Sequence, residues 1–396
     1  MERERSTWRS ASPADKPRTV LYLHSSAGRY GADRQLGLIA TGLDPTRYRP
    51  LVVLPEEGSL ATDLRSAGVD VQIRPLAVLR RALMSPRGLG RVSAAWAADA
   101  GGLGRLARAR GVAVVHTNTS VTLGGAAAAR IAGVPHVWHV REIYAGFERW
   151  WPGYRRLLLT ADALPCVSAA TLAQFDGAPG ARLFSDGLPR EPRRADREAA
   201  RAALDLPADR FVVALLGRIS AWKGQDVLAR ALADPALRDV GAIGLIAGAA
   251  WPGEERHERE LGELAQRLGL GDRLRLLGFR DDPETVIGAA DAVGVPSTQP
   301  DPLPNAALEA AAAGCCVVAA AHGGLTEIVI DGETGLLVAP GDPAALARSL
   351  RRLADDPALA ARLGQAAAED VSLRFAPALL LDRLQSLYDE LLAHPP

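Results

Sequence analysis

The first half of the chain alternates short apolar runs with longer segments in which apolar residues recur every three or four positions. This alternation is typical of strands that take turns with amphipathic helices, and it predicts βαβ units and a parallel sheet. The predicted strands lie at 19–24, 50–55, 112–117 and 135–140. One predicted helix begins at Asp33, and two others cover 59–68 and 123–133.

A second series of the same kind begins at residue 211. The stretch 188–210 separates the two series, and its density of Pro and charged residues favours a linker followed by a covering helix. We therefore expect two α/β domains whose parallel strands point their carboxyl ends at a shared cleft, where such sheets bind ligands. The second series has predicted strands at 211–217, 242–248, 273–279, 292–296 and 315–321, and an amphipathic helix at 256–269.

The pattern divides the chain into five segments. Residues 1–17 mix charges with Ser and Pro, which predicts a mobile tail. The two domains are expected at 18–190 and 208–374, with a linker and covering helix at 191–207. Residues 375–396 have the apolar spacing of a helix with one buried stripe, and we expect this helix to pack back on the first domain.

Composition narrows the kind of partner. At 396 residues and 48% apolar, the chain can form two cores. Its 46 basic and 46 acidic residues leave no net charge, so no overall field favours nucleic acid, and a small-molecule site is the better expectation. No apolar run is long enough to span a membrane. Arg-rich surface helices leave peripheral membrane contact open.

The cysteines and the N-terminal residues bear on the compartment. Cys166, Cys315 and Cys316 lack metal-ligand spacing, and an adjacent pair is a poor disulfide. The first residues have no apolar core of the kind that a signal peptide needs. We therefore expect a cytoplasmic protein without a structural zinc ion.

Two glycine-containing segments partly match nucleotide-binding motifs, but the residues around or within them do not fit those motifs. Gly102, Gly104 and Ala107 match the dinucleotide fingerprint, but a helical stretch precedes them where a strand is required. The segment GRISAWKG (217–224) is not a phosphate-binding P-loop, because Trp222 stands where that motif needs Gly.

The segment 217–224 nevertheless holds an unusual lysine. Lys16 and Lys223 are the only lysines, and the other 44 basic residues are arginines. Arg218 and Lys223 follow a predicted strand, where a guanidinium can grip two phosphate oxygens and an ammonium can act as a point charge between them. We expect a diphosphate there. The alternative is that one lysine survived by chance in an Arg-biased chain.

Two acidic residues belong to the helix expected after Pro304. Asp301 precedes this helix and Glu309 lies in its second turn, so both can face a ligand at the helix N-terminus. The free N–H groups and the dipole of that end suit phosphate. The alternative is that Asp301 only caps the helix and Glu309 lies on a solvated face.

These segments together carry a family resemblance. GRISAWKG, LLGFRDDPETVIGAADAVGVPS, DPLPNAALEAAAAG and HGGLTEIVIDGETGLLVAPGD follow one another in an order and spacing that resemble the family-four retaining glycosyltransferases of the GT-B fold. SSAGRYGADRQ and WHVRE resemble that family's glycine loop and acceptor-side histidine stretch. The resemblance covers most of 19–390 and implies two Rossmann-like domains facing a central cleft. The first domain would be on the acceptor side, and the second would bind a nucleotide sugar.

The resemblance also implies a donor site. Arg218 and Lys223 would bind the diphosphate, and Glu309 would accept hydrogen bonds from the ribose hydroxyls. Asp301 would contact hydroxyls of the donor sugar, although it is one methylene shorter than the family's glutamate. The other donor-side residues that the resemblance implies are Gly31 under the phosphates, Phe279 and Arg280 beside the base, Leu303, Asn305, Gly323 and Gly324.

The first domain would supply the remaining groups. The resemblance places His139 beside the transferred sugar. It implies five catalytic residues: His139, Arg218, Lys223, Asp301 and Glu309. On the acceptor side it implies His116, Asn118, Arg141 and Glu142. A histidine at a strand end is often a satisfied structural residue, and this alternative stays open for both histidines.

The implied reaction moves a sugar from a nucleoside diphosphate to a hydroxyl of a glycan, a lipid-linked precursor or a small natural product, with retention of configuration. No D-x-D triplet occurs in the sequence, so we expect no metal ion and no cofactor besides the donor. The alternatives are a nucleotide-sugar epimerase and a catalytically silent nucleotide-sugar-binding protein. The misplaced fingerprint argues against a nicotinamide-dependent oxidoreductase. The sequence identifies neither acceptor, sugar, nucleotide nor oligomeric state.

Overall fold

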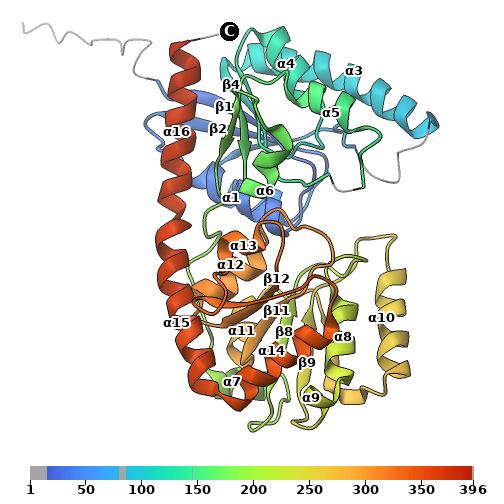
Figure 1. Cartoon of the computed structure of the whole chain (residues 1–396). Coiled ribbons are helices and arrows are strands. Elements are labelled where there is room, and N and C mark those ends of the chain that lie inside the picture. Colours follow the sequence, from blue (N-terminus) through green and yellow to red (C-terminus); the bar gives the residue numbers. More distant parts are fainter. Residues whose placement is uncertain (1–15, 80–85, 145, 395–396) are drawn as a thin grey trace, which may run out of the picture.

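The computed structural model describes residues 16–79, 86–144 and 146–394. Two domains, each built on a parallel sheet, lie one above the other, and two C-terminal helices run along both of them (Figure 1). Most of the predicted N-terminal tail lies outside the described residues.

The first sheet has five parallel strands in the order β3-β2-β1-β4-β5. Its central strand pairs on both sides, so that Leu23 lies beside Val53 and Thr117 at the carboxyl edge. A small parallel pair, β6 and β7, follows. The strands are β1 (Arg18–Leu23), β2 (Tyr48–Leu54), β3 (Asp70–Ile73), β4 (Val112–Thr117), β5 (His136–Trp138), β6 (Leu164–Cys166) and β7 (Ala181–Leu183).

Helices cover both faces of the first sheet. Leu36 and Leu64 join one apolar cluster with the C-terminal helix, whereas Leu103 and Ala128 join another on the opposite face. The helices are α1 (Gly31–Gly42), α2 (Ser59–Ser66), α3 (Pro86–Ala109), α4 (Gly125–Ala132), α5 (Trp151–Leu158) and α6 (Ala169–Leu172).

The glycines of the dinucleotide-like motif lie inside α3, so the motif lacks the strand-to-helix turn that such a fingerprint needs. A Cβ on Gly104 would come within 2.5 Å of the Ile131 side chain. This glycine therefore allows α3 and α4 to pack closely.

The second sheet has six parallel strands in the order β10-β9-β8-β11-β12-β13. The strands are β8 (Val212–Leu216), β9 (Ile243–Ala247), β10 (Leu274–Gly278), β11 (Ala292–Val295), β12 (Cys316–Ala320) and β13 (Gly335–Val338). The helices are α7 (Arg197–Ala203), α8 (Gln225–Ala233), α9 (Pro235–Arg238), α10 (Arg256–Arg267), α11 (Pro283–Ala289), α12 (Asn305–Ala312), α13 (Leu325–Ile328), α14 (Pro343–Asp355), α15 (Pro357–Arg374) and α16 (Pro377–Ala393).

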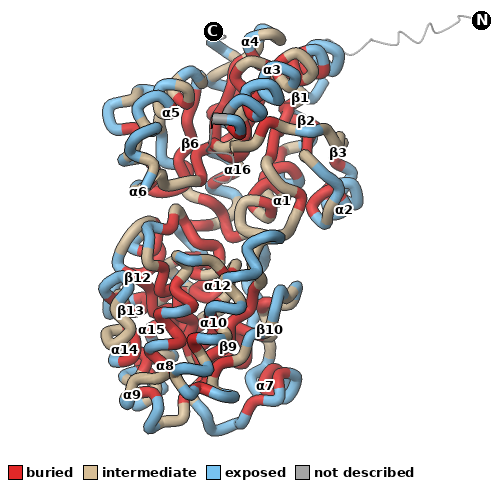
Figure 2. Tube along the Cα trace, turned by 90° about the vertical axis from the view of Figure 1, so that its right-hand side faces the viewer, coloured by how far each residue is buried: buried red, intermediate tan, exposed pale blue. Residues whose placement is uncertain are grey.

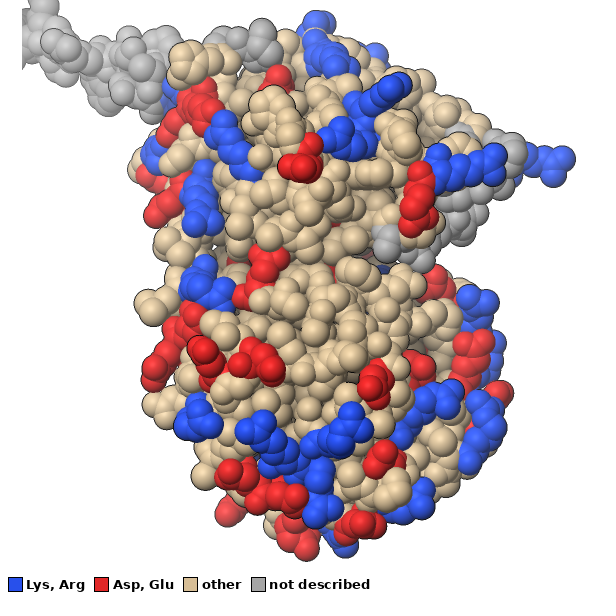
Figure 3. Space-filling view, in the orientation of Figure 1, with Lys and Arg blue, Asp and Glu red and all other residues tan. Residues whose placement is uncertain are grey.

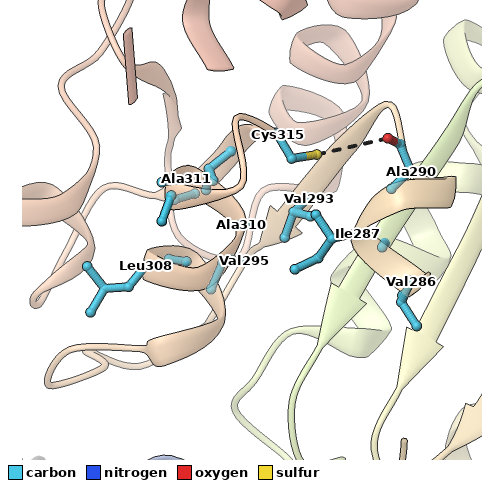
Figure 4. Packing of buried hydrophobic residues seen from close by; sticks show 14 of the residues in the cluster. Val286, Ile287, Ala290, Val293, Val295, Leu308, Ala310, Ala311 and Cys315 are labelled. Atoms are coloured by element: carbon cyan, nitrogen blue, oxygen red, sulfur yellow. Dashed lines mark hydrogen bonds between the residues drawn. The ribbon is translucent and has the colours of Figure 1, made fainter. Parts of the chain in front are cut away.

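The adjacent cysteines point to opposite faces of this sheet. Cys315 lies in the cluster formed with α11 and α12, where its Sγ donates to the Ala290 carbonyl oxygen at 4.0 Å (Figure 4). Cys316 belongs to the cluster on the other face, with Leu228 and Leu350. Both thiols are free and buried, so they pack rather than pair.

The structure departs from the predicted elements at a few places. The helix expected from Asp33 begins at Gly31, because the Asp33 carboxylate accepts a hydrogen bond from the Tyr30 N–H at 2.9 Å and so closes the first turn. Four short strands were not predicted. Strands β3, β6, β7 and β13 each contain only three or four residues, and unlike the equally short β5 and β11 they were not singled out by an apolar run in the sequence.

The C-terminal helices connect the domains. α15 packs on α12 and β12, and α16 packs on α1 and β4 (Figure 1). The Tyr388 hydroxyl lies 2.9 Å from the Tyr22 hydroxyl and 2.5 Å from the His116 Nδ1, inside the first domain. The chain leaves the first domain near Leu188 and returns to it near Phe375, and the Leu188 N–H donates to the Phe375 carbonyl oxygen at 2.9 Å. The two interdomain crossings therefore lie side by side.

The surface fits the neutral composition. Buried residues follow the strands and the inner sides of the helices (Figure 2). On the face shown in Figure 3, acidic and basic side chains are interspersed. None of the described helices combines the length and the apolar character that crossing a membrane requires.

We predict that α16 stabilises the first domain through its buried stripe. Leu384→Ala should lower the free energy of unfolding by about 2–5 kcal/mol, because Leu384 is fully buried against that domain. Leu379, 40% exposed on the same helix, provides the control, and its replacement by Ala should cost under about 0.5 kcal/mol. Urea unfolding measures both. Equal losses would contradict the buried contact.

Candidate functional site

Two glycines shape the carboxyl edge of the second sheet. Gly217 follows β8 with φ 146°, and Gly248 follows β9 with φ 157°. A Cβ on Gly248 would lie 1.9 Å from the Gly217 carbonyl oxygen, a distance that no side chain tolerates. The two loops therefore touch backbone to backbone, which fixes where Arg218 leaves the sheet.

Arg218 is a largely buried cation. Its Cζ lies 5.1 Å from the centroid of the Trp251 ring, within the range of a cation–π contact. Burial lowers the pKa of Arg218 from its ordinary value, but an arginine stays charged. Its buried Nε finds no hydrogen-bond partner among the residues that the structure describes. Arg218 thus retains donor capacity for an anion.

Lys223 and Asp301 form an ion pair. The Lys223 Nζ donates to the Asp301 Oδ2 at 2.5 Å and lies 4.5 Å from the centroid of the Trp222 ring. Gly224 then turns the chain into α8 with φ 81°, where a Cβ would lie 2.0 Å from the Pro296 carbonyl oxygen. The structure thus brings together the two side chains that the sequence assigned to the diphosphate and to the donor sugar.

The Gly323–Gly324 turn holds the loop that carries Asp301. The Gly324 N–H donates to the Asp301 carbonyl oxygen at 2.8 Å. A Cβ on Gly323 would lie 2.4 Å from that oxygen, and one on Gly324 would lie 2.0 Å from the Pro302 carbonyl oxygen. Both glycines are therefore required by backbone packing. Leu303, on the same loop, is buried in the core of the second domain.

Glu309 is bonded to the other domain. The Arg34 Nη1 on α1 donates to the Glu309 Oε1 on α12 at 2.7 Å, and the two side chains are 17% and 12% exposed. Asp301 is one loop away from this helix, as the sequence predicted. The ion pair with Arg34 was not predicted.

The first turns of α1 and α12 meet beside this ion pair. The Asn305 Nδ2 donates to the Gly31 carbonyl oxygen at 3.1 Å, and the Gln35 Nε2 donates to the Asn305 Oδ1 at 3.2 Å and to the Gly187 carbonyl oxygen at 2.7 Å. Gly31 and Asn305, both assigned to the donor side, therefore also form an interdomain contact.

Aromatic rings close one end of this region. Tyr30, from the first domain, lies 5.4 Å from Trp251 and 5.7 Å from Phe279, measured between ring centroids. Arg280 forms a two-bond ion pair with Asp282, at 2.8 and 2.6 Å. The Phe279 ring is 43% exposed, so it offers a free face.

A pocket of about 260 Å³ adjoins Glu309. Its walls come from the interdomain segment at 188–193 and from α11 and α12. Glu309 thus lines this pocket, while its carboxylate is bonded to Arg34.

His139 directly follows β5 and is completely buried. Its ring lies 5.4 Å from the His116 ring, and neither of its nitrogens has a hydrogen-bond partner in the described part of the chain. Burial, with the nearby charge of Arg141, lowers the pKa of both histidines well below the ordinary value. His139 is therefore neutral and has unused hydrogen-bonding capacity.

The remaining acceptor-side residues form a buried network. The Arg141 guanidinium pairs with Asp186 and donates through Nε to the Asn118 carbonyl oxygen at 2.9 Å. Glu142 accepts from the Ser120 N–H at 3.1 Å, and burial raises its pKa. These side chains are bonded within the first domain, and their contact with an acceptor stays a prediction.

Sequence reasoning missed the polar groups that follow the first strand. The Asp33 Oδ1 accepts from the His24 Nε2 at 2.8 Å and from the Ser26 Oγ at 2.6 Å. Burial would raise the pKa of Asp33, but these hydrogen bonds lower it. The network fixes the loop that leads to Tyr30 and Arg34. The available signal was the glycine loop itself, SSAGRYGADRQ, which contains both Ser26 and Asp33.

The architecture matches known structures over nearly the whole chain. The Anabaena protein Alr3699/HepE, solved in complex with UDP and glucose, aligns with a TM-score of 0.80 and 27% identity, covering 93% of this chain and 99% of that one. A sucrose-phosphate synthase from Thermosynechococcus elongatus has the same fold, with a TM-score of 0.75 and 22% identity. The fold is thus GT-B, with two Rossmann-like domains and a C-terminal helix that returns to the first.

Sequence relatives define the family. The profile described as "Glycosyl transferases group 1" matches residues 196–370. A D-inositol 3-phosphate glycosyltransferase from Saccharomonospora viridis is 38% identical over 303 residues, which cover 74% of this chain and 68% of that protein. The enzyme of the same name from Streptomyces avermitilis is 44% identical over 184 residues, but the match spans only 39% of its length. The chain belongs to the group 1 glycosyltransferases.

The buried histidines predict a loss of stability in mild acid. Burial lowers the pKa of His136 to about 3 and also depresses those of His116 and His139. Below a pH of about 6.5 the unfolded chain binds protons that the folded chain does not. The free energy of unfolding should therefore fall with pH, by up to about 1.4 kcal/mol per pH unit for each histidine.

The contribution of one histidine is measured by difference. His139→Gln should flatten the decrease between a pH of about 6.5 and 5 by up to about 1.4 kcal/mol per unit, because one of the three groups is removed. His394, exposed after α16, provides the control, and His394→Gln should follow the wild-type slope. Urea unfolding at several pH values checks both. Parallel curves for all three proteins would contradict the prediction.

Proposed function

We propose that this protein is a retaining glycosyltransferase that moves a sugar from a nucleoside-diphosphate sugar to an acceptor hydroxyl. The observation that carries the proposal is the Lys223–Asp301 ion pair, which joins the loop after β8 to the loop before α12; Asn305, the first residue of α12, bonds in turn to Gly31 of the first domain. Arg218 lies on the same loop as Lys223. Two cations and a helix N-terminus suit a diphosphate.

The comparisons support a uridine nucleotide as the first donor to test. Alr3699/HepE, a structural neighbour, was solved with UDP and with UDP-glucose. The relatives are named as transferases to D-inositol 3-phosphate, so this acceptor is tested first, beside glycans, lipid-linked precursors and small hydroxylated products.

The proposed chemistry depends on electrostatics. Negative charge develops on the departing diphosphate as the sugar becomes cationic. Arg218, Lys223 and the N–H groups of α12 would stabilise it, and preorganised groups of this kind are worth several kcal/mol. Asp301 would accept a hydrogen bond from the sugar while it keeps Lys223 in place. We propose catalysis without a metal ion or further cofactor, since the chain's own cations can do this work.

The first domain would complete the site. In this proposal His139 hydrogen-bonds a hydroxyl of the transferred sugar through its ring nitrogens, which have no partner in the part of the chain that the structure describes. Arg141 and Glu142 would shape the acceptor side from the network behind it. A cytoplasmic location, with or without peripheral membrane contact, belongs to the same proposal.

A panel of nucleotide sugars, incubated with and without acceptors, tests the function. Release of nucleotide that depends on an acceptor, with a product of unchanged anomeric configuration, supports retaining transfer. Isomerisation of the donor without an acceptor would identify an epimerase. Binding without turnover for every pair would leave only a nucleotide-sugar-binding protein. Activity that survives a chelator supports metal independence, and its loss would remove that part of the proposal.

Lys223→Arg should not be a conservative change. The broad guanidinium fork would displace the diphosphate from a position suited to a point charge, so kcat/KM should fall at least about tenfold, or about 1.4 kcal/mol. Lys16→Arg, at an exposed position, is the matched control and should leave kcat/KM unchanged. A Lys223→Arg enzyme with unchanged kcat/KM would contradict the diphosphate contact and favour the alternative that this lysine survived by chance.

His139→Ala should lower kcat while UDP affinity stays close to that of the wild type. The reason is that a side chain which orients the sugar acts mostly in the reacting complex. Titration with UDP and turnover measurements on one purified variant provide the two readouts. Normal turnover combined with reduced thermal stability would show that His139 stabilises the fold and does not orient the sugar.

A further inference from the structure

The ion pair between Arg34 and Glu309 joins the two domains at the residue that the family resemblance assigns to the ribose. Only one carboxylate oxygen, Oε1, is bonded to Arg34. Glu309 is also one of the residues that line a pocket of about 260 Å³. The second oxygen, Oε2, is not among the hydrogen-bonded atoms of the described residues, so it can accept from a ligand while Arg34 holds the first.

Arg34 is well placed to fix the direction of that carboxylate. Its position on α1 is set by the capped first turn, in which the Arg34 N–H donates to the Tyr30 carbonyl oxygen at 2.9 Å. The side chain is only 17% exposed. A buried guanidinium on a fixed helix has few alternative positions, and a charge-assisted hydrogen bond is both short and directional.

The neighbouring contacts keep the domains together without Arg34. Asn305 bonds to Gly31 and to Gln35, and Gln35 bonds to Gly187. On the exposed side, Arg29 forms a second interdomain ion pair with Asp281 at 3.0 Å. Removing the Arg34 guanidinium therefore leaves the interface largely intact and frees one side of Glu309.

We infer that Arg34 is a positioning residue for ribose recognition: it orients the Glu309 carboxylate from across the domain boundary, so that the free oxygen accepts hydrogen bonds from the ribose hydroxyls. This inference rests on the proposed function. It makes discrimination between ribose and deoxyribose depend on a residue of the opposite domain. It also means that the ribose hydroxyls are recognised by a correctly oriented Glu309 only when the two domains are in contact.

The test measures the affinity of the full-length protein for UDP and 2′-deoxy-UDP by calorimetry, with GDP and 2′-deoxy-GDP as a second pair. The wild type should prefer the ribonucleotide by about tenfold, the value of one hydrogen bond to a charged group. Glu309→Gln and Arg34→Met should each remove most of this preference, and the double variant should lose no more than either alone. Arg34→Lys, which keeps one charged donor, should restore part of it.

Arg29→Met is the matched control, since it removes an interdomain ion pair that does not touch Glu309. It should keep the ribose preference. The same loss in Arg29→Met and Arg34→Met would show general loosening of the domains and would overturn the inference. So would an unchanged preference in Arg34→Met, or tighter UDP binding, which would mean that Arg34 blocks the ribose.

The two proposals fail in different ways. If Glu309→Gln keeps the wild-type preference, the ribose contact assigned to Glu309 is wrong, whatever Arg34 does. If neither UDP nor GDP binds the wild type, the donor site is wrong. If Glu309→Gln loses the preference and Arg34→Met keeps it, only the role of Arg34 is wrong. Thermal midpoints of all variants confirm that each protein is folded.

Discussion

The contact between the first turns of α1 and α12 is the constraint on which the rest of the site depends. Asn305 and Gln35 bond across it, and Arg34 and Glu309 form its ion pair. This contact places the glycine loop of one sheet against a helix N-terminus of the other. The α15–α16 connection supports this arrangement from outside.

The loops around the site are held by backbone contacts that exclude side chains. Gly248 touches Gly217, and Gly323 touches the loop of Asp301, at distances that no Cβ permits. Such contacts remove freedom from the loops before a ligand arrives, so Arg218 and Asp301 are positioned in advance. Preorganised charges stabilise a reacting diphosphate more than mobile ones, because they need not reorient. Among the described residues, the ring nitrogens of His139 and the Nε of Arg218 have no hydrogen-bond partner, which leaves bonding capacity for a ligand.

Both halves of the proposed site contain an ion pair. Lys223 is bonded to Asp301, and Arg34 is bonded to Glu309. Each pair keeps a partly buried charge from being uncompensated, which would otherwise be costly. A ligand that inserts between or beside these charges exchanges one set of charged hydrogen bonds for another, so specificity depends on geometry more than on total charge.

The sequence by itself determined the two parallel sheets and the family, because strand and helix periods are local and the four motifs keep a fixed order. It also pointed to Arg218, Lys223, Asp301 and Glu309 as one group, since residues after parallel strands gather at one edge. Only the tertiary structure decided how these charges pair. Arg34 lies 275 positions from Glu309, and nothing local marks it as a partner. The short strand β13 and the burial of His139 likewise depend on long-range packing, which no window of sequence contains.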